Sequence, residues 1–162
     1  MASSTQNIAI VIACYNRPLS LCRILESLSS ASYPDHPVPL VISIDRSDVQ
    51  ADLIALAEAF DWPFGDKTIR AFDERQGLRK HILQCGDVAL EHDGVIVLED
   101  DLIIGANFYP FATQAVATVG MDDRVAGISL YAPAINEMAP LPFTPAPSRF
   151  DGYFLQSTQS WG

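Results

Sequence analysis

Residues 94–105, GVIVLEDDLIIG, constrain the fold of this chain more than any other stretch. The first five are apolar and rich in β-branched side chains, a pattern typical of a short strand that is buried on both faces of a parallel sheet. Glu99, Asp100 and Asp101 follow directly, and a second apolar run comes after them. Carboxylates gathered at the end of a buried strand repel one another, and burial adds a desolvation cost, unless a cation neutralises them. The stretch therefore predicts a divalent metal site, with a solvated acidic turn as the alternative.

Apolar runs and helical patterns alternate along the rest of the chain. Strands are predicted at residues 8–14, 38–45, 67–72, 94–98 and 125–131. Helices are predicted from Pro18 for about three turns, and at residues 50–60, 77–91 and 107–119. This alternation is the signature of an α/β fold with a parallel or mixed, doubly wound sheet and a Rossmann-like nucleotide-binding half.

The chain is predicted to form a single domain over residues 1–162. The α/β core is expected at 8–131, and 132–162 reads as a proline-rich loop that leads into a further, acceptor-binding half. The last residues, ending in a tryptophan and a glycine, carry no polar tail. We therefore expect this chain to be the N-terminal part of a longer protein.

Polar side chains follow three of the predicted strands. Asn16 and Arg17 come after the first, Asp45 ends the second, and the acidic triplet follows the fourth. In open α/β sheets ligands bind at the carboxyl ends of the strands, so these groups are expected to share one site. Arg17 has the fork of donors that suits a phosphate, but it equally suits a solvated loop. Asp45 can accept from a base N–H, although turns and helix caps are the more frequent use of Asp.

The composition narrows the class of protein. Of 162 residues, 20 are acidic and 10 are basic, and the net charge of -10 argues against a nucleic-acid-binding surface. An anionic ligand would be repelled unless a metal or a few basic groups offset the field. Cys14, Cys22 and Cys85 show neither metal spacing nor a disulfide framework, which favours a reducing compartment. With no signal peptide and no apolar run of membrane-spanning length, the protein is expected in the cytoplasm or, through a partner, at a membrane surface.

The predicted helix at 77–91 carries the one histidine of interest. Leu78, Ile82, Cys85 and Ala89 fall on one face by helical spacing, and His81 borders that face. His81 can contact a nucleotide or simply pack against the core. No nucleophile elbow, Gly-rich GxGxxG loop or Walker loop is present, which excludes several hydrolase and nucleotide-binding classes.

Four segments taken in order, CYNRP, ISID, GLRKH and VLEDD, resemble the GT-A fold glycosyltransferases of the family 2-like kind. Within these, the motifs look most like the N-acetylglucosaminyltransferase I type, whose acidic motif is Glu-Asp-Asp. The likeness runs from residue 8 to residue 131. It implies an inverting, metal-dependent transfer of a sugar from a UDP-sugar to a hydroxyl acceptor, such as a glycan or polysaccharide precursor.

The resemblance also implies roles for single residues. Asp101 matches the direct ligand of Mn²⁺ (or Mg²⁺), Arg17 the arginine that contacts the nucleotide, and Asp45 the aspartate that reads uracil. His81 matches a histidine near the base, although the helix spacing differs here. The implied donor and nucleotide site comprises Cys14, Asn16, Arg17, Asp45, His81, Glu99 and Asp100. No residue matches the general base; Asp151 is the one late candidate, and its position argues against it.

Two alternatives stay open. A sugar-1-phosphate nucleotidyltransferase would use a related α/β sheet, but it would be expected to open with a Gly-rich phosphate loop, and the segment after Cys14 contains no glycine. A non-catalytic module that binds a nucleotide or a cation is the second alternative. Turnover by the whole protein distinguishes the glycosyltransferase and the nucleotidyltransferase from the non-catalytic module.

Overall fold

The computed structural model describes residues 7–120, 122 and 124–130, and three further short strands at 135–136, 141–142 and 154–157. The helices are α1 (Pro18–Ser29), α2 (Gln50–Ala59), α3 (Leu78–Gly86) and α4 (Phe108–Val119), with a 3₁₀ turn, η1, at Asp87–Leu90. The strands are β1 (Ile8–Cys14), β2 (Leu40–Ile44), β3 (Lys67–Ala71), β4 (Gly94–Glu99), β5 (Ile128–Ser129), β6 (Ile135–Asn136), β7 (Leu141–Pro142) and β8 (Phe154–Ser157).

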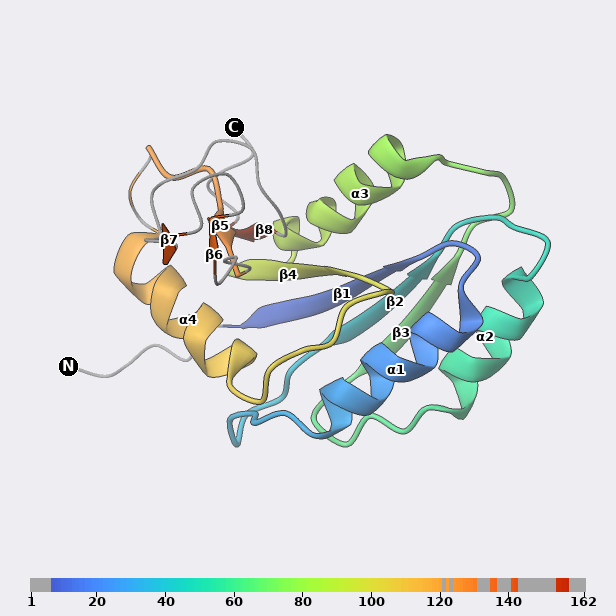
Figure 1. Ribbon diagram of the computed structural model, residues 1–162, viewed down its shortest axis with the longest axis horizontal. Helices are drawn as coiled ribbons and strands as arrows, with labels where there is room; N and C mark the ends of the chain where they lie inside the picture. The colour runs from blue at the N-terminus through green and yellow to red at the C-terminus, as the bar shows by residue number, and fades with distance from the viewer. Residues whose placement is uncertain are drawn as a thin grey trace.

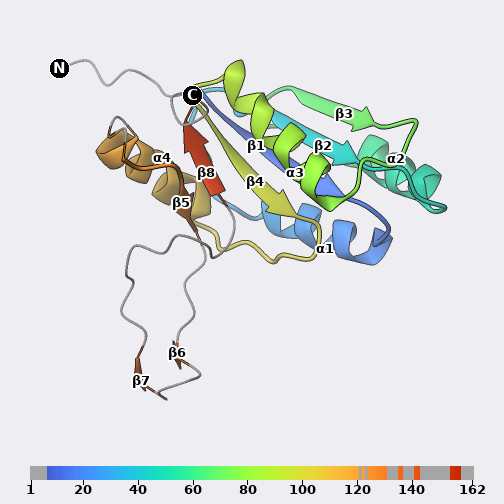
Figure 2. The same ribbon diagram turned by 90° about the horizontal axis from the view of Figure 1, so that it is seen from above.

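Six strands form one mixed sheet in the order β3-β2-β1-β4-β8-β5 (Figures 1 and 2). The first four run parallel, while β8 is antiparallel to both β4 and β5. The α/β prediction is therefore confirmed. The strand expected at 125–131 is shorter than predicted, and β8 lies in a stretch predicted as loop. Apart from the short strands β6, β7 and β8, residues 132–162 with Asp151 lie outside the described part of the chain.

Strand β1 shows how the two faces of the sheet are filled. All seven of its residues are buried. Ile10 and Ile12 pack into the larger core with α1, α2 and α4, whereas Val11 and Ala13 pack into a smaller core with α3 and η1. Successive strand residues point to opposite faces, so a continuous apolar run is what a strand covered on both sides needs. Figure 1 shows α3 on the opposite side of the sheet from α1 and α2.

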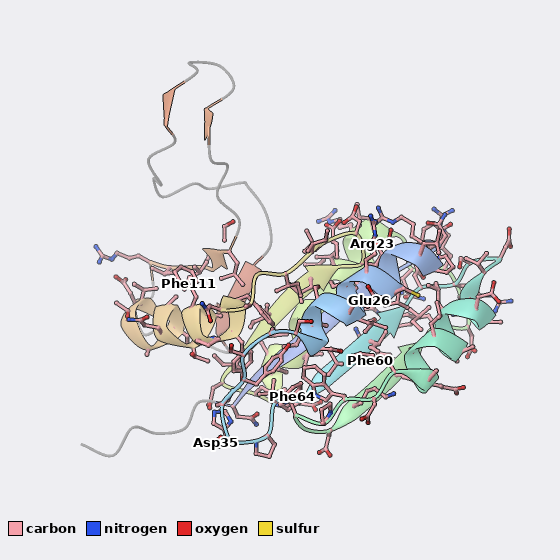
Figure 3. All side chains as sticks on the ribbon, turned by 60° about the horizontal axis from the view of Figure 1, so that its bottom comes forward. Arg23, Glu26, Asp35, Phe60, Phe64 and Phe111 are labelled. Carbon is pink, nitrogen blue, oxygen red and sulfur yellow. The ribbon has the colours of Figure 1, made fainter. Side chains whose placement is uncertain are left out.

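Helix α1 begins where the sequence predicts. Pro18 lies in its first turn, where the missing N–H leaves no hydrogen bond unmade. Leu21, Ile24 and Leu28 are fully buried against the sheet. Arg23 and Glu26 are exposed on its outer face (Figure 3).

The predicted buried face of α3 and η1 is confirmed at Ile82, Cys85 and Ala89 but wrong at Leu78. Leu78 is 75% exposed, while His81 is only 4% exposed and Cys85 is fully buried. Leu78 is the first residue of the helix and projects at its open end, so its apolar character does not place it in the core. The helix also ends at Gly86, where the chain tightens into η1 rather than continuing to residue 91.

Gly65 lies between α2 and β3, against the backbone of Val38, and is expected to be intolerant of substitution. A Cβ there would lie 2.5 Å from the backbone oxygen of Val38 and 2.7 Å from its nitrogen, and that nitrogen already bonds to Phe64. We expect Gly65→Ala to lower the free energy of unfolding by about 2 kcal/mol, because backbone must move. Gly105→Ala is the control, since its Cβ would meet nothing within 4 Å. Equal urea midpoints for the two variants would contradict this expectation.

Candidate functional site

Pairing of β1 with its two neighbours brings three strand ends together. Cys14 at the end of β1 pairs with Ile44 of β2, and Ala13 pairs with Glu99 of β4. The hydrogen bonds continue one residue further, from the Asp45 N–H to the Cys14 carbonyl and from the Asp100 N–H to the Ala13 carbonyl. Asp45 and Asp100 therefore lie on either side of the end of β1. The predicted gathering of polar groups at the carboxyl edge is observed.

Asp45 holds the loop that precedes α3. Its side chain is 3% exposed. Oδ1 accepts the backbone N–H of Arg46 at 2.8 Å and of Gln76 at 2.7 Å, and Oδ2 accepts that of Gly77 at 3.0 Å. Gly77 has φ +76°, a left-handed conformation that L side chains rarely adopt. Three amide donors and a glycine thus fix the loop against the end of β2.

His81 is held from the other side by β2 and β3. Its Nε2 lies 2.7 Å from Ser43 Oγ, which also accepts Nε and Nη2 of Arg70 at 3.2 and 3.0 Å. Because Arg70 can only donate, the Ser43 hydroxyl is left to donate to Nε2, and we assign the imidazole hydrogen to Nδ1. Burial lowers the pKa of His81, with Asp45 opposing the shift and Arg70 adding to it. The neutral ring therefore presents one fixed donor.

Arg17 joins two of the three triplet carboxylates. Its Nη1 donates to Asp101 Oδ2 at 2.6 Å, and its Nη2 lies 2.7 Å from Asp100 Oδ1. Asp100 is fully buried, and its other oxygen accepts the Tyr15 N–H at 3.4 Å. Apart from this guanidinium, the buried Oδ1 of Asp100 has no partner among the described residues.

Two carboxylates of the triplet, Glu99 and Asp100, are costly to ionise where they stand. Burial raises the pKa of Asp100, against the opposing effect of Arg17. Burial raises the pKa of Glu99 as well, with Asp101 adding to the shift. A raised pKa means that each group favours its neutral form and gains from a nearby cation. The half-exposed guanidinium of Arg17 supplies one positive charge to this cluster.

These shifts predict a pH dependence of stability in metal-free protein. A carboxyl whose folded pKa is raised stabilises the fold fully below its unfolded pKa of about 4, and this contribution is lost as pH rises through the folded value. We therefore expect a free energy of unfolding that declines across the mildly acidic range. The decline should be smaller in a double variant, Glu99→Gln with Asp100→Asn. Urea unfolding in EDTA at several pH values measures it, and parallel curves for the two proteins would contradict it.

A cavity of about 240 Å³ opens between these groups. Its lining includes the predicted residues Cys14, Arg17, Asp45, His81, Glu99 and Asp100. Neither Asn16, which is exposed, nor Asp101 lines the cavity. Asp101 is hydrogen-bonded to Arg17, which does line it. Cys14 is fully buried, and burial raises the pKa of its thiol. The residue therefore lines the cavity without the thiolate character that a nucleophile needs.

Tyr15 and Arg75 also line the cavity and were not predicted. The Arg75 guanidinium lies 5.0 Å from the centre of the Tyr15 ring, a cation–π contact between the β1–α1 and β3–α3 loops. The signal that identifies Arg75 is its place in the loop after the third parallel strand, at the same edge as the other site residues. It adds a second basic group beside the cavity of an acidic protein.

The residues present fit a metal ion that takes one or two protein carboxylates and completes its shell with phosphate oxygens of a bound nucleotide and with water. Among the described residues no three His, Cys, Asp or Glu side chains converge on one point, so no complete protein-only metal cage exists there. The half-exposed Asp101 and the Oδ1 atom of Asp100, both now paired with Arg17, nevertheless offer hard oxygen atoms. Divalent cations that serve phosphates commonly take one or two carboxylates and complete their shell with phosphate oxygens and water.

Solved structures share this fold. The mannosyltransferase PcManGT from Pyrobaculum calidifontis, solved with GDP-Man and Mn²⁺, superposes with a TM-score of 0.56 at 16% identity, over 71% of this chain and 33% of its own. TarS from S. aureus superposes at 0.53 with 15% identity, over 69% of this chain and 20% of its own. The TarS 1-349 structure with UDP-GlcNAc superposes at 0.52 with 15% identity, over 69% of this chain and 31% of its own.

The comparisons are confined to structure. No protein-family model and no curated protein sequence matches the chain. The described residues contain no helix of the length and apolarity needed to cross a bilayer. This chain spans between 20% and 33% of the length of the solved structures just named. Their likeness shows that the chain has a GT-A-like glycosyltransferase fold.

Proposed function

We propose that this chain is the donor-binding part of a metal-dependent glycosyltransferase that moves a sugar from a UDP-sugar to a hydroxyl acceptor. The observation that carries the proposal is the cavity at the carboxyl edge of the sheet, where Asp45, His81 and Arg17 meet Glu99 and Asp100. Ligands of open α/β sheets bind at this edge. The fold shared with a mannosyltransferase solved with GDP-Man and Mn²⁺ supports the same class of donor.

The hydrogen-bonding groups of the cavity favour a uracil-like base. A carboxylate offers about four acceptor positions, and three of those of Asp45 are taken by amides, which leaves one on Oδ2. That position suits a base N–H such as N3–H of uracil. His81 also lines the cavity, where a neutral imidazole with its hydrogen on Nδ1 would donate to a base carbonyl. At the position of uracil N3–H, cytosine N3 and adenine N1 are acceptors and offer no hydrogen to the Asp45 carboxylate.

The acidic triplet and Arg17 are assigned to the diphosphate and the sugar. Asp101 would hold Mn²⁺ or Mg²⁺, with Asp100 Oδ1 beside it, while Glu99 lines the cavity where hydroxyls of the donor sugar can bond to its carboxylate. When bound, the metal acts as a Lewis acid that offsets the charge of the departing diphosphate. Arg17 and Arg75 lower the repulsion that a net charge of -10 imposes on an anionic donor. The general base is not assigned to any described residue.

A panel of nucleotides tests the proposal against its alternatives. Equilibrium dialysis with Mn²⁺ should rank UDP above GDP, ADP and CDP, and EDTA should abolish the UDP binding. A sugar-1-phosphate nucleotidyltransferase would instead release pyrophosphate from UTP or CTP with a sugar phosphate. Equal affinity for all four diphosphates would contradict the proposal. Binding of UDP without sugar transfer by the whole protein would favour the non-catalytic module.

A further inference from the structure

Arg17 was predicted to contact the nucleotide and Asp101 to bind the metal, yet in the structure the two side chains bind each other. The guanidinium donates to Asp101 Oδ2 at 2.6 Å and lies 2.7 Å from Asp100 Oδ1. Side chains of Arg17 and Asp101 are 46% and 39% exposed, whereas that of Asp100 is 1% exposed. The positive charge is thus shared between one accessible and one inaccessible carboxylate.

A guanidinium and a divalent cation compete for the same oxygen atoms. Both are drawn to Asp101 Oδ2 and to Asp100 Oδ1, and two cations at contact distance from one oxygen repel each other. While Arg17 spans both carboxylates, its Nη1 and Nη2 are turned toward them. Its strongest donors are then engaged and are not offered to a diphosphate.

We infer that Arg17 is an internal counter-ion of the triplet, which a divalent cation displaces from Asp101 and thereby releases to bind the diphosphate of the donor. This inference rests on the proposed function and adds an order to it: the cation binds the carboxylates and the arginine moves to the phosphates. The exposure of Arg17 and Asp101 makes the exchange feasible, because a half-solvated ion pair is weak. Asp100 stays in place through the Tyr15 N–H and the β1 hydrogen bond of its own N–H.

Binding of Mn²⁺ alone measures the competition. Free Mn²⁺ is counted by its electron paramagnetic resonance signal during titration into wild type, Arg17→Gln and Arg79→Gln, without any nucleotide. We expect Arg17→Gln to bind Mn²⁺ about fivefold more tightly than wild type, because one competing ion pair is gone. Arg79→Gln removes the same charge from the exposed first turn of α3 and should stay within about twofold of wild type, since screened charges act weakly.

A second arm measures the release. With Mn²⁺ present, Arg17→Gln should bind UDP about tenfold more weakly than wild type, because a charge-assisted contact to phosphate is lost. Arg17→Lys keeps a single charge and should fall between the other two proteins in both arms. It also replaces Arg17→Gln if the latter fails to fold.

Each other outcome overturns a stated part of the account. Equal tightening of Mn²⁺ binding in Arg17→Gln and Arg79→Gln would mean general electrostatics and would overturn the counter-ion role. Unchanged Mn²⁺ affinity in Arg17→Gln, with normal Mn²⁺-dependent UDP binding by wild type, would overturn the inference and leave the proposed function standing. Absence of Mn²⁺ binding by wild type even with UDP present would overturn both.

Discussion

Asp101→Asn is expected to lower the affinity for UDP in Mn²⁺ by roughly 100-fold, to the level seen in EDTA. Asn keeps the size of the side chain but offers a neutral carbonyl oxygen in place of a carboxylate. The fold should persist, because Asp101 is exposed and its recorded partner is the half-exposed Arg17. Isothermal titration of UDP in Mn²⁺ measures the loss.

Asp52→Asn is the matched control for this change. It removes the same charge from the exposed face of α2, away from the cavity lining. Its UDP affinity should equal that of wild type, and its urea midpoint should fall slightly, because the carboxylate of Asp52 lies in the first turn of α2. An Asp101→Asn protein that binds UDP normally in Mn²⁺ would remove Asp101 from the metal site.

Asp45→Ala is expected to affect both stability and recognition of the base. Loss of the carboxylate leaves the N–H groups of Gln76 and Gly77 without their acceptor, which should lower the free energy of unfolding by about 2–3 kcal/mol. The loop before α3 would no longer be fixed, and the base would lose an acceptor. We therefore expect UDP affinity to fall by more than ADP affinity, measured on protein shown to be folded at the assay temperature.

Two further variants separate these effects. Asp48→Ala removes an exposed carboxylate three residues along the chain and should change neither stability nor UDP binding. Asp45→Asn keeps one acceptor, so its loss of stability should be smaller than that of Asp45→Ala. If Asp45→Ala lowered the affinities for UDP and ADP equally, Asp45 would stabilise the loop before α3 but would not recognise the base.

The parallel core could be predicted because its sequence signal is local. Strand β1 is an unbroken apolar run, and the structure buries all seven of its residues between helices on both faces. Asp45 and Asp100 could be placed at one edge because each directly follows a parallel strand, and parallel strands end together. No contact between distant segments needed to be known for either conclusion.

The remaining features depend on contacts that no local pattern encodes. The position of Asp45 at the end of a strand does not predict its hydrogen bonds to the backbone of Gln76 and Gly77, which lie 31 and 32 residues away. His81 is buried and Leu78 exposed because Ser43 on β2 receives the imidazole, a partner 38 residues distant. Helical spacing and hydrophobicity alone predict that Leu78, and not His81, is the buried residue.

For the acidic triplet, the sequence predicted the burial of carboxylates but not their pairing with Arg17. Its position between two apolar runs predicted carboxylates that burial makes costly to ionise, which is confirmed for Glu99 and Asp100 but not for the exposed Asp101. The sequence also indicated that a cation would be needed. It did not indicate that the protein supplies one itself through Arg17, 84 residues before Asp101, because that ion pair forms only when β1 and β4 lie side by side.

Calorimetric titration of UDP, first in Mn²⁺ and then in EDTA, tests the central claim that this edge of the sheet binds a nucleotide donor through a metal. The account predicts saturable binding at one site in Mn²⁺, preferred over ADP and GDP, and no measurable heat in EDTA. UDP binding of equal strength in both conditions would contradict the role of the metal. No binding in either condition would contradict the assignment of the cavity as a donor site.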